Sequence, residues 1–208
     1  MGSLKKTLRI KIDRAHPDKK LLSYAAKILR EGGLVAFPTE TVYGLGANML
    51  DKEAVKNLYK VKKRTGNKPF TVHIASLGQI KKLRCGMDVR SGKLARRFWP
   101  GPLTMVLKSE SGEGVGFRMP KNVVALELIR MAKTPVVAPS ANISSNKPPV
   151  TAAEVLKDLD GKIDIVIDSG PTDIGLESTV LNMMTKPYTV LREGALKDKD
   201  IRKILKYG

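Results

Sequence analysis

The segment from Leu34 to Ile74 constrains the fold of this chain more than any other stretch. It starts with a short apolar run, residues 34–37, which a glycine pair precedes and a proline follows, so we predict a buried strand there. Polar side chains of residues 39–43 come directly after it, at the carboxyl end where ligands bind in open α/β sheets. Gly44 and Gly46 allow a turn with close backbone approaches. The segment therefore predicts a ligand-binding turn after a buried strand.

A basic helix and a second strand follow this turn. Asp51 is the predicted N-cap, and the helix has apolar residues at helical spacing on one face (Ala54, Val55, Leu58, Val61) and lysines on the other (Lys52, Lys56, Lys60, Lys63). In the next loop Arg64 and Lys68 flank a Gly-Asn turn and a proline that would hold them in place. Residues alternate in the strand beyond, so His73 points away from the apolar face. Helix lysines are also typical of a solvent-exposed face, and a strand histidine can be structural.

Two further strands end in polar side chains. Gly114, Gly116 and Arg118 share one face of an alternating strand, which leaves a ligand room to reach the guanidinium. Arginine is suited to a bidentate carboxylate contact, although an exposed arginine on a weak strand fits the pattern equally well. The buried strand 135–138 ends in residues 139–145, which include Ser140 and Asn142. These form either a ligand-facing loop or a turn whose side chains cap their own backbone.

Apolar spacing and capping residues place the other elements. Strands are predicted at 8–12, 103–107, 163–167 and 189–194, and helices at 76–83, 88–99, 122–132 and 198–207, with further helices opened by Asp18 and by a capping box, Thr151 to Glu154. Alternating helices and strands predict an α/β fold. We expect one domain, residues 1–208, with a twisted mixed sheet flanked by helices and an open, positively charged cleft lined by strand ends.

The charge of the chain points to anionic partners. The sequence has 38 Lys and Arg against 20 Asp and Glu, a net charge of +18, which favours nucleic acid or nucleotide phosphates. Aromatic residues make up 5%, which disfavours a single-strand binder built on stacking. A lysine-rich composition also fits a thermophilic proteome.

Other functional classes are disfavoured by composition. No apolar run approaches the roughly 20 residues that cross a bilayer, and no signal-peptide core is present, so we expect a cytoplasmic protein without membrane contact. Cys85 is the sole cysteine, which excludes an internal disulfide and a cysteine-based zinc site. With two histidines and neither a Ser-His-Asp arrangement nor paired carboxylates, we expect no dedicated metal site and no catalytic base. Cationic and hydroxyl groups position anions instead.

The motifs together closely resemble the YrdC family of threonylcarbamoyl-AMP synthases, in its single-domain form. The resemblance runs from about Ala15 to Gly194 and rests on PTETVYGLG (38–46), K-x-R (62–64), K-P (68–69), H-I (73–74), FWPGPLT (98–104), R-x-P (118–120), PSAN-x-S (139–144), S-T-V (178–180) and Arg192. It implies the YrdC-like fold. The chain departs from the family pattern at two places. It has Ser144-Ser145 where Ser-Gly is usual, and it has Pro149 where a serine is usual. A phosphate contact from position 149 is therefore not expected.

The resemblance also implies a reaction and a division of the site. L-Threonine, bicarbonate and ATP give threonylcarbamoyl-AMP and pyrophosphate, the first step of tRNA threonylcarbamoyladenosine modification, and a downstream tRNA transferase uses the product. The residues implied for L-threonine are Thr41, His73, Arg118 and Ser178, and those implied for the nucleotide are Lys62, Arg64, Lys68, Ser140, Asn142 and Arg192. We expect Mg²⁺ to be carried with ATP, because the sequence offers no carboxylate cage.

Two other functions stay open at this point. The charge of +18 would also suit a non-catalytic RNA-binding protein, and contact with tRNA is compatible with either function. The departures at Ser144-Ser145 and Pro149 leave room for a paralogue of the same fold that acts on another carbamoyl or acyl substrate.

Overall fold

The computed structural model describes residues 6–64 and 69–206. The strands in these ranges are β1 (Leu8–Lys11), β2 (Val35–Phe37), β3 (Gly44–Asn48), β4 (Val72–His73), β5 (Leu103–Lys108), β6 (Gly114–Arg118), β7 (Val136–Val137), β8 (Ile165–Asp168), β9 (Thr179–Asn182) and β10 (Thr189–Arg192). The helices are α1 (Lys19–Arg30), α2 (Lys52–Val61), α3 (Gly78–Lys82), α4 (Val89–Phe98), α5 (Val123–Ala132), α6 (Ala152–Leu159) and α7 (Asp198–Lys206). The predicted α/β class is confirmed.

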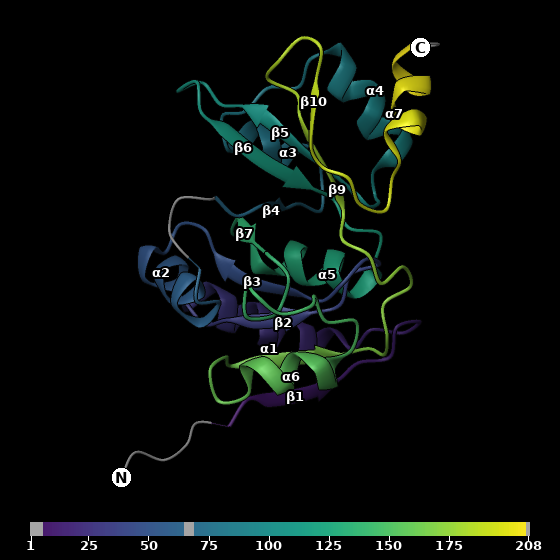
Figure 1. Cartoon of the computed structure of the whole chain (residues 1–208). Coiled ribbons are helices and arrows are strands. Elements are labelled where there is room, and N and C mark those ends of the chain that lie inside the picture. The colour runs from purple at the N-terminus through teal and green to yellow at the C-terminus, as the bar shows by residue number, and fades with distance from the viewer. Residues whose placement is uncertain (1–5, 65–68, 207–208) are drawn as a thin grey trace.

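The strands form one mixed sheet that runs the length of the molecule (Figure 1). Their order is β1-β8-β2-β3-β7-β4-β6-β5-β9-β10, with parallel pairs such as β4–β6 and antiparallel pairs such as β2–β3. Strand β1 lies at one end of the sheet, and β10 lies at the other beside α7 (Figure 1). No helix in the described ranges is long and apolar enough to span a membrane.

Five of the seven described helices begin where a side chain satisfies free backbone N–H groups. Asp18, Asp51, Asn122 and Thr151 each accept a hydrogen bond from the backbone of the first turn of α1, α2, α5 and α6. The capping interaction is local in sequence, and all four helix starts are as predicted. Asp88, where the helix 88–99 was predicted to begin, likewise accepts a bond from the Ser91 backbone at the start of α4.

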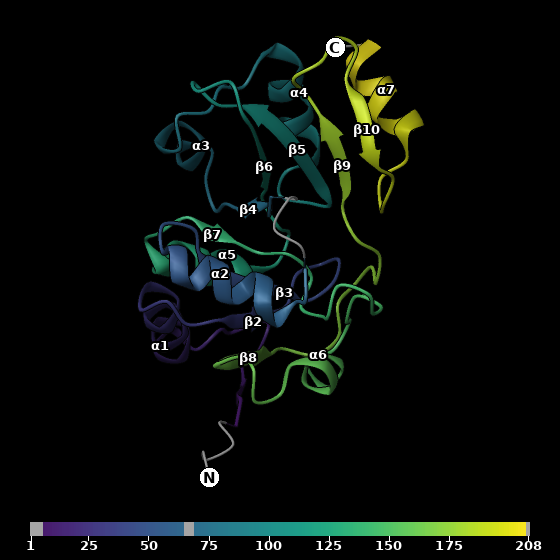
Figure 2. The same ribbon diagram turned by 60° about the vertical axis from the view of Figure 1, so that its left-hand side comes forward.

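Helices cover both faces of the sheet. Side chains alternate along β2, so Val35 and Phe37 pack with apolar residues of α1 and α5, whereas Ala36 packs into the cluster that includes α2 and α6. Helix α2 lies over β3, as Figure 2 shows. At the far end of the sheet α4 and α7 pack side by side in both views (Figures 1 and 2). The sheet is therefore buried between helical layers along much of its length.

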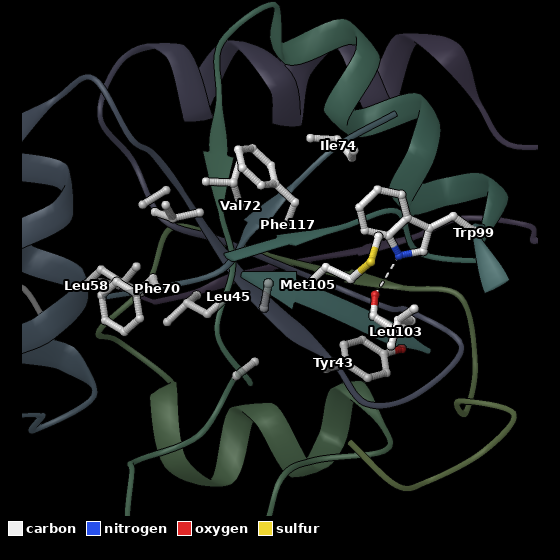
Figure 3. Packing of buried hydrophobic residues seen from close by; sticks show 14 of the residues in the cluster. Tyr43, Leu45, Leu58, Phe70, Val72, Ile74, Trp99, Leu103, Met105 and Phe117 are labelled. Atoms are coloured by element: carbon white, nitrogen blue, oxygen red, sulfur yellow. Dashed lines mark hydrogen bonds between the residues drawn. The ribbon is translucent and has the colours of Figure 1, made fainter. Parts of the chain in front are cut away.

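The larger apolar cluster continues through the central strands. Met105 and Phe117 are fully buried and oppose each other on β5 and β6. The indole N–H of Trp99 donates to the Leu103 carbonyl at 2.7 Å, so this large side chain is buried with its polar atom satisfied (Figure 3). Trp99 is therefore part of the core.

The prediction of a turn at Gly44 and Gly46 is wrong. Both glycines belong to β3, which pairs antiparallel with β2 and with β7. The close approach expected of them is present, because a Cβ on Gly46 would lie 2.9 Å from Cε1 of Phe37. Glycine here allows the Phe37 ring to pack against a strand rather than allowing the chain to turn. The bend itself is confined to the polar residues before β3.

Candidate functional site

A cavity of about 410 Å³ lies where strand ends and loops from most of the chain converge. Its lining comes from the bend before β3 (Thr39, Val42, Tyr43, Gly44), the end of α2 and the approach to β4 (Arg64, Pro69, Phe70, Thr71, His73), strands β5 and β6 (Thr104, Arg118), the loop after β7 (Ala138, Pro139, Ser140), and β9, β10 and the residues before β9 (Glu177, Ser178, Val180, Leu191, Arg192). Six of the predicted site residues line it: Arg64, His73, Arg118, Ser140, Ser178 and Arg192.

Arg118 and His73 lie side by side in the deepest part of the sheet. They are register partners on the parallel strands β6 and β4, and they are 5% and 4% exposed. Nη2 of Arg118 lies 2.9 Å from Oε2 of Glu40, whose side chain is also buried. The two charges are in contact but not aligned as a hydrogen bond, so both retain bonding capacity.

Unsatisfied polar atoms are concentrated at these three residues. Among the described residues, eight buried side-chain nitrogen or oxygen atoms have no hydrogen-bond partner. Five of them are both carboxylate oxygens of Glu40, Nδ1 of His73, and Nε and Nη2 of Arg118. Buried polar groups are nearly always bonded, so such a concentration indicates a site that a polar ligand completes. Nε and Nη2 form one edge of the guanidinium, which matches the two oxygens of a carboxylate.

Burial sets the protonation of this group. It lowers the pKa of His73 to about 3, and the neighbouring Arg118 charge acts in the same direction. His73 is therefore neutral at physiological pH and interacts through hydrogen bonds. Burial also lowers the pKa of Arg118, while Glu40 opposes the shift. Arginine starts so far above neutrality that Arg118 stays cationic.

Arg192 on β10 holds the residues before β9 against the cavity. Its Nε and Nη2 donate to the Ser178 carbonyl at 3.1 and 3.0 Å, and Nη1 lies 2.6 Å from Oε1 of Glu177. The Ser178 hydroxyl is 2.8 Å from that of Thr104. Arg192 is half-exposed, so the same guanidinium can face a ligand at the mouth of the cavity.

Arg64 reaches the cavity from the end of α2. Its guanidinium carbon lies 4.9 Å from the centre of the Phe70 ring, a cation–π distance. The aromatic ring orients the charge while leaving its hydrogen-bond donors available. Arg64, Arg118 and Ser140, which the sequence places far apart, therefore share one cavity.

Three predicted site residues lie behind the cavity lining. The Thr41 hydroxyl is buried 2.9 Å from that of Thr39, and Thr39 rather than Thr41 lines the cavity. The Asn142 side chain donates to the carbonyls of Ile143 and Asn146 at 3.0 and 2.6 Å. Lys62 is buried under the loop after β7. A fourth predicted residue, Lys68, lies outside the described residues.

The departures from the family pattern lie outside the cavity lining. The carbonyl of Pro149 accepts a hydrogen bond of 2.9 Å from the Tyr43 backbone, so this segment supports the bend beside the cavity. Ser144 and Ser145 are exposed.

From the sequence, Glu40 was included only among the polar residues 39–43, and no carboxylate was assigned to the site. Glu40 contacts Arg118, and Glu177 lines the cavity and contacts Arg192, so carboxylates accompany the expected cationic and hydroxyl residues. Each glutamate directly precedes a residue that was predicted, Thr41 and Ser178. Adjacency was the available signal, but pairing with a distant arginine could not be inferred from it.

The described residues do not form a cage for a metal ion. No group of three or more His, Cys, Asp or Glu side chains gathers anywhere in the ranges that the structure covers. Glu40 and Glu177 are each already in contact with an arginine. Magnesium prefers carboxylate and phosphate oxygens, so these residues do not fit a resident Mg²⁺.

The model of the Sua5_yciO_yrdC family, described as "Telomere recombination", matches residues 27–194. The chain belongs to this family. A threonylcarbamoyl-AMP synthase of Pyrococcus abyssi is 47% identical over 190 residues, which are 87% of this chain and 56% of the relative. A relative in Methanocaldococcus jannaschii is 32% identical over 203 residues, which are 94% of this chain and 96% of the relative. The chain thus spans about half the length of the first relative and nearly all of the second.

Solved structures agree with this assignment. The crystal structure of P. abyssi Sua5 complexed with L-threonine superimposes with a TM-score of 0.91 at 43% identity, covering 96% of this chain and 61% of that one. The crystal structure of E. coli YciO gives a TM-score of 0.82 and covers 95% of this chain and 99% of that one. At 23% identity YciO supports the fold alone. The predicted YrdC-like fold is confirmed.

Proposed function

We propose that this chain is an L-threonylcarbamoyladenylate synthase. It converts L-threonine, bicarbonate and ATP into threonylcarbamoyl-AMP and pyrophosphate, the first step of tRNA threonylcarbamoyladenosine modification. The observation that carries the proposal is the buried Arg118, whose Nε and Nη2 lack hydrogen-bond partners among the described residues and whose side chain lines the same cavity as Arg64 and Ser140. Relatives that bear this name support it at 47% and 42% identity.

The reaction joins two anions. The free threonine amine attacks the bicarbonate carbon, a C–N bond forms, a C–O bond breaks, and water leaves to give N-carboxythreonine. One oxygen of the new carboxylate then attacks the α-phosphorus of ATP, the bond to the bridging oxygen of the β-phosphate breaks, and pyrophosphate leaves. Fixed cations lower the barrier by holding these anions together and stabilising the phosphoryl charge.

The deep end of the cavity suits threonine. The Nε–Nη2 edge of Arg118, whose atoms lack hydrogen-bond partners among the described residues, would hold the amino-acid carboxylate through two parallel hydrogen bonds. Neutral His73 beside it offers a hydrogen-bonding group for the ligand's polar atoms without adding charge. Ser178 and Thr104 add hydroxyls to the lining, and Thr41 supports Thr39 from behind. The solved complex of the P. abyssi relative with L-threonine supports this assignment.

The open end suits the nucleotide. Arg64, Ser140 and Arg192 would contact ATP, with Lys62 and Asn142 supporting Ser140, and Lys68 stays a predicted contact. Mg²⁺ would bind together with the ATP phosphates, because the described residues offer no carboxylate cage of their own. The product passes to a tRNA-modifying transferase, and a cytoplasmic location is part of the proposal.

The experiment is to incubate the chain with L-threonine, isotopically labelled bicarbonate and ATP and to identify the product by mass spectrometry. The proposal predicts labelled threonylcarbamoyl-AMP. A same-fold paralogue would form no such product from threonine but would form an adenylate from another amino acid. An RNA-binding protein would form neither, and its RNA affinity would fall log-linearly with salt.

A further inference from the structure

The ammonium group of Lys62 is buried inside the protein, unlike the other lysines of its helix. Lys62 is 2% exposed, whereas Lys56 and Lys60 on α2 and Lys63 beside it are exposed. Its Nζ donates to the carbonyls of Ser140 and Asn142 at 2.5 and 2.7 Å. Two bonds to backbone carbonyls use most of the three donors of an ammonium group. Lys62 therefore has little capacity left for a phosphate.

The loop that Lys62 contacts, residues 140–146, is held from two sides by opposite charges. Lys62 binds its carbonyls, and the Lys62 carbonyl accepts the Ser144 N–H at 3.0 Å. On the other side Asp158 of α6 accepts from the Ile143 backbone at 3.0 Å and from the Asn146 side chain at 2.8 Å. The Lys62 ammonium thus donates to carbonyl groups of the loop, and the Asp158 carboxylate accepts from N–H groups of the loop.

Lys62 also connects two walls of the cavity. Arg64, two residues further along, lies over Phe70 on one wall, and Ser140 lies on another. Lys62 and Ser140 are 78 residues apart in sequence, and the Lys62 ammonium joins the end of α2 to the Ser140 wall directly. Charged hydrogen bonds in a buried setting are the strong class, so the bridge is stiff.

We propose that Lys62 is a positioning residue that clamps the 140–146 loop to the end of α2 and so fixes Ser140 opposite Arg64, without touching the nucleotide itself. The nature of the ligand rests on the proposed function; the clamp does not. Burial, with help from Arg64, lowers the pKa of Lys62 to about 8, while Glu177 and Asp158 oppose the shift. Burial disfavours the charged form of Lys62, so its hydrogen bonds to the loop carbonyls must compensate for this desolvation.

The clamp is tested by hydrogen–deuterium exchange on the ligand-free chain. Lys62→Met keeps the length of the side chain and removes its charge and donors, and Lys60→Met is the matched control on the exposed face of α2. We expect amides of residues 140–146 to exchange about tenfold faster or more in Lys62→Met and to be unchanged in Lys60→Met. Unchanged exchange in Lys62→Met overturns the clamp. Should this variant not fold, Lys62→Gln is measured instead, with the same expectation.

Nucleotide binding separates positioning from direct contact. If Lys62 is a clamp, Lys62→Met lowers the affinities for ATP and for AMP by the same factor, since Ser140 is displaced for both nucleotides. A direct contact with the β- or γ-phosphate predicts that only ATP is weakened, and that result would overturn the proposal. If wild type binds neither nucleotide, the proposed function fails while the exchange result still decides the clamp.

Discussion

Nη2 of Arg118 lies 2.9 Å from Oε2 of Glu40, and both side chains are more than nine-tenths buried. A buried arginine without a counter-charge is strongly destabilising, so Glu40 stabilises the folded protein, while Nε of Arg118 keeps no hydrogen-bond partner among the described residues. The same negative charge opposes an incoming carboxylate. Glu40 therefore stabilises the folded protein and lowers the affinity of the site for a carboxylate ligand.

Glu40→Gln tests that relationship. We expect the ligand-free protein to lose about 3–5 kcal/mol of unfolding free energy, because Arg118 becomes an unpaired buried charge. Saturating L-threonine should restore more stability to the variant than to wild type, since its carboxylate replaces the missing one. Urea unfolding with and without threonine measures both effects. An equal or smaller threonine effect in Glu40→Gln would show that Glu40 does not compete for Arg118.

Arg118→Lys keeps the charge and removes the bidentate edge. We expect threonine affinity to fall about tenfold to a hundredfold, the effect of losing a charge-assisted hydrogen bond, with ATP affinity unchanged. Calorimetric titration with each ligand measures this division of the cavity. Arg130→Lys, an exposed position, is the control. A parallel loss of ATP affinity would mean that Arg118 does not belong to a separate threonine subsite.

Arg64→Ala should have the opposite selectivity. Removing the guanidinium over Phe70 is expected to weaken ATP about tenfold to a hundredfold and to leave threonine binding alone. Arg97→Ala is a matched control, because Arg97 lies over Phe98 at 5.5 Å in a similar cation–π contact away from the cavity. ATP affinity that survives Arg64→Ala would remove this residue from the nucleotide subsite.

His73 makes stability depend on pH. Its pKa is lowered from 6.5 to about 3 by burial. Between these two pH values the His73 side chain binds a proton in the unfolded chain but not in the folded chain. Stability is full above pH 6.5 and is lost toward pH 3, at about 1.4 kcal/mol per pH unit for one proton. Between pH 6.5 and 5, wild type should lose about 2 kcal/mol more than His73→Asn.

His16→Asn is the control for that comparison, because its side chain is 89% exposed and should leave the pH profile of wild type unchanged. Parallel profiles for wild type and His73→Asn would mean that His73 titrates normally in the folded protein.

The features that sequence predicted are those decided by neighbouring residues. Asp51 caps α2 because its carboxylate reaches N–H groups two and three residues later, and alternation along β6 places Arg118 beside the cavity. The strand β3 was not predicted, because Gly44 and Gly46 are more typical of a turn. The reason for glycine in this strand is the Phe37 ring, which packs against it from the adjacent strand and cannot be located from sequence. The orientation of Lys62 was also beyond sequence reasoning, since its partners lie 78 and 80 residues away.

The most direct test of the account is pyrophosphate release by the purified chain, measured with each substrate omitted in turn. The account predicts release that requires L-threonine, bicarbonate and ATP together, and that Arg118→Lys reduces at low threonine concentration. Release from ATP that does not depend on threonine, or no release when all three are present, would contradict it.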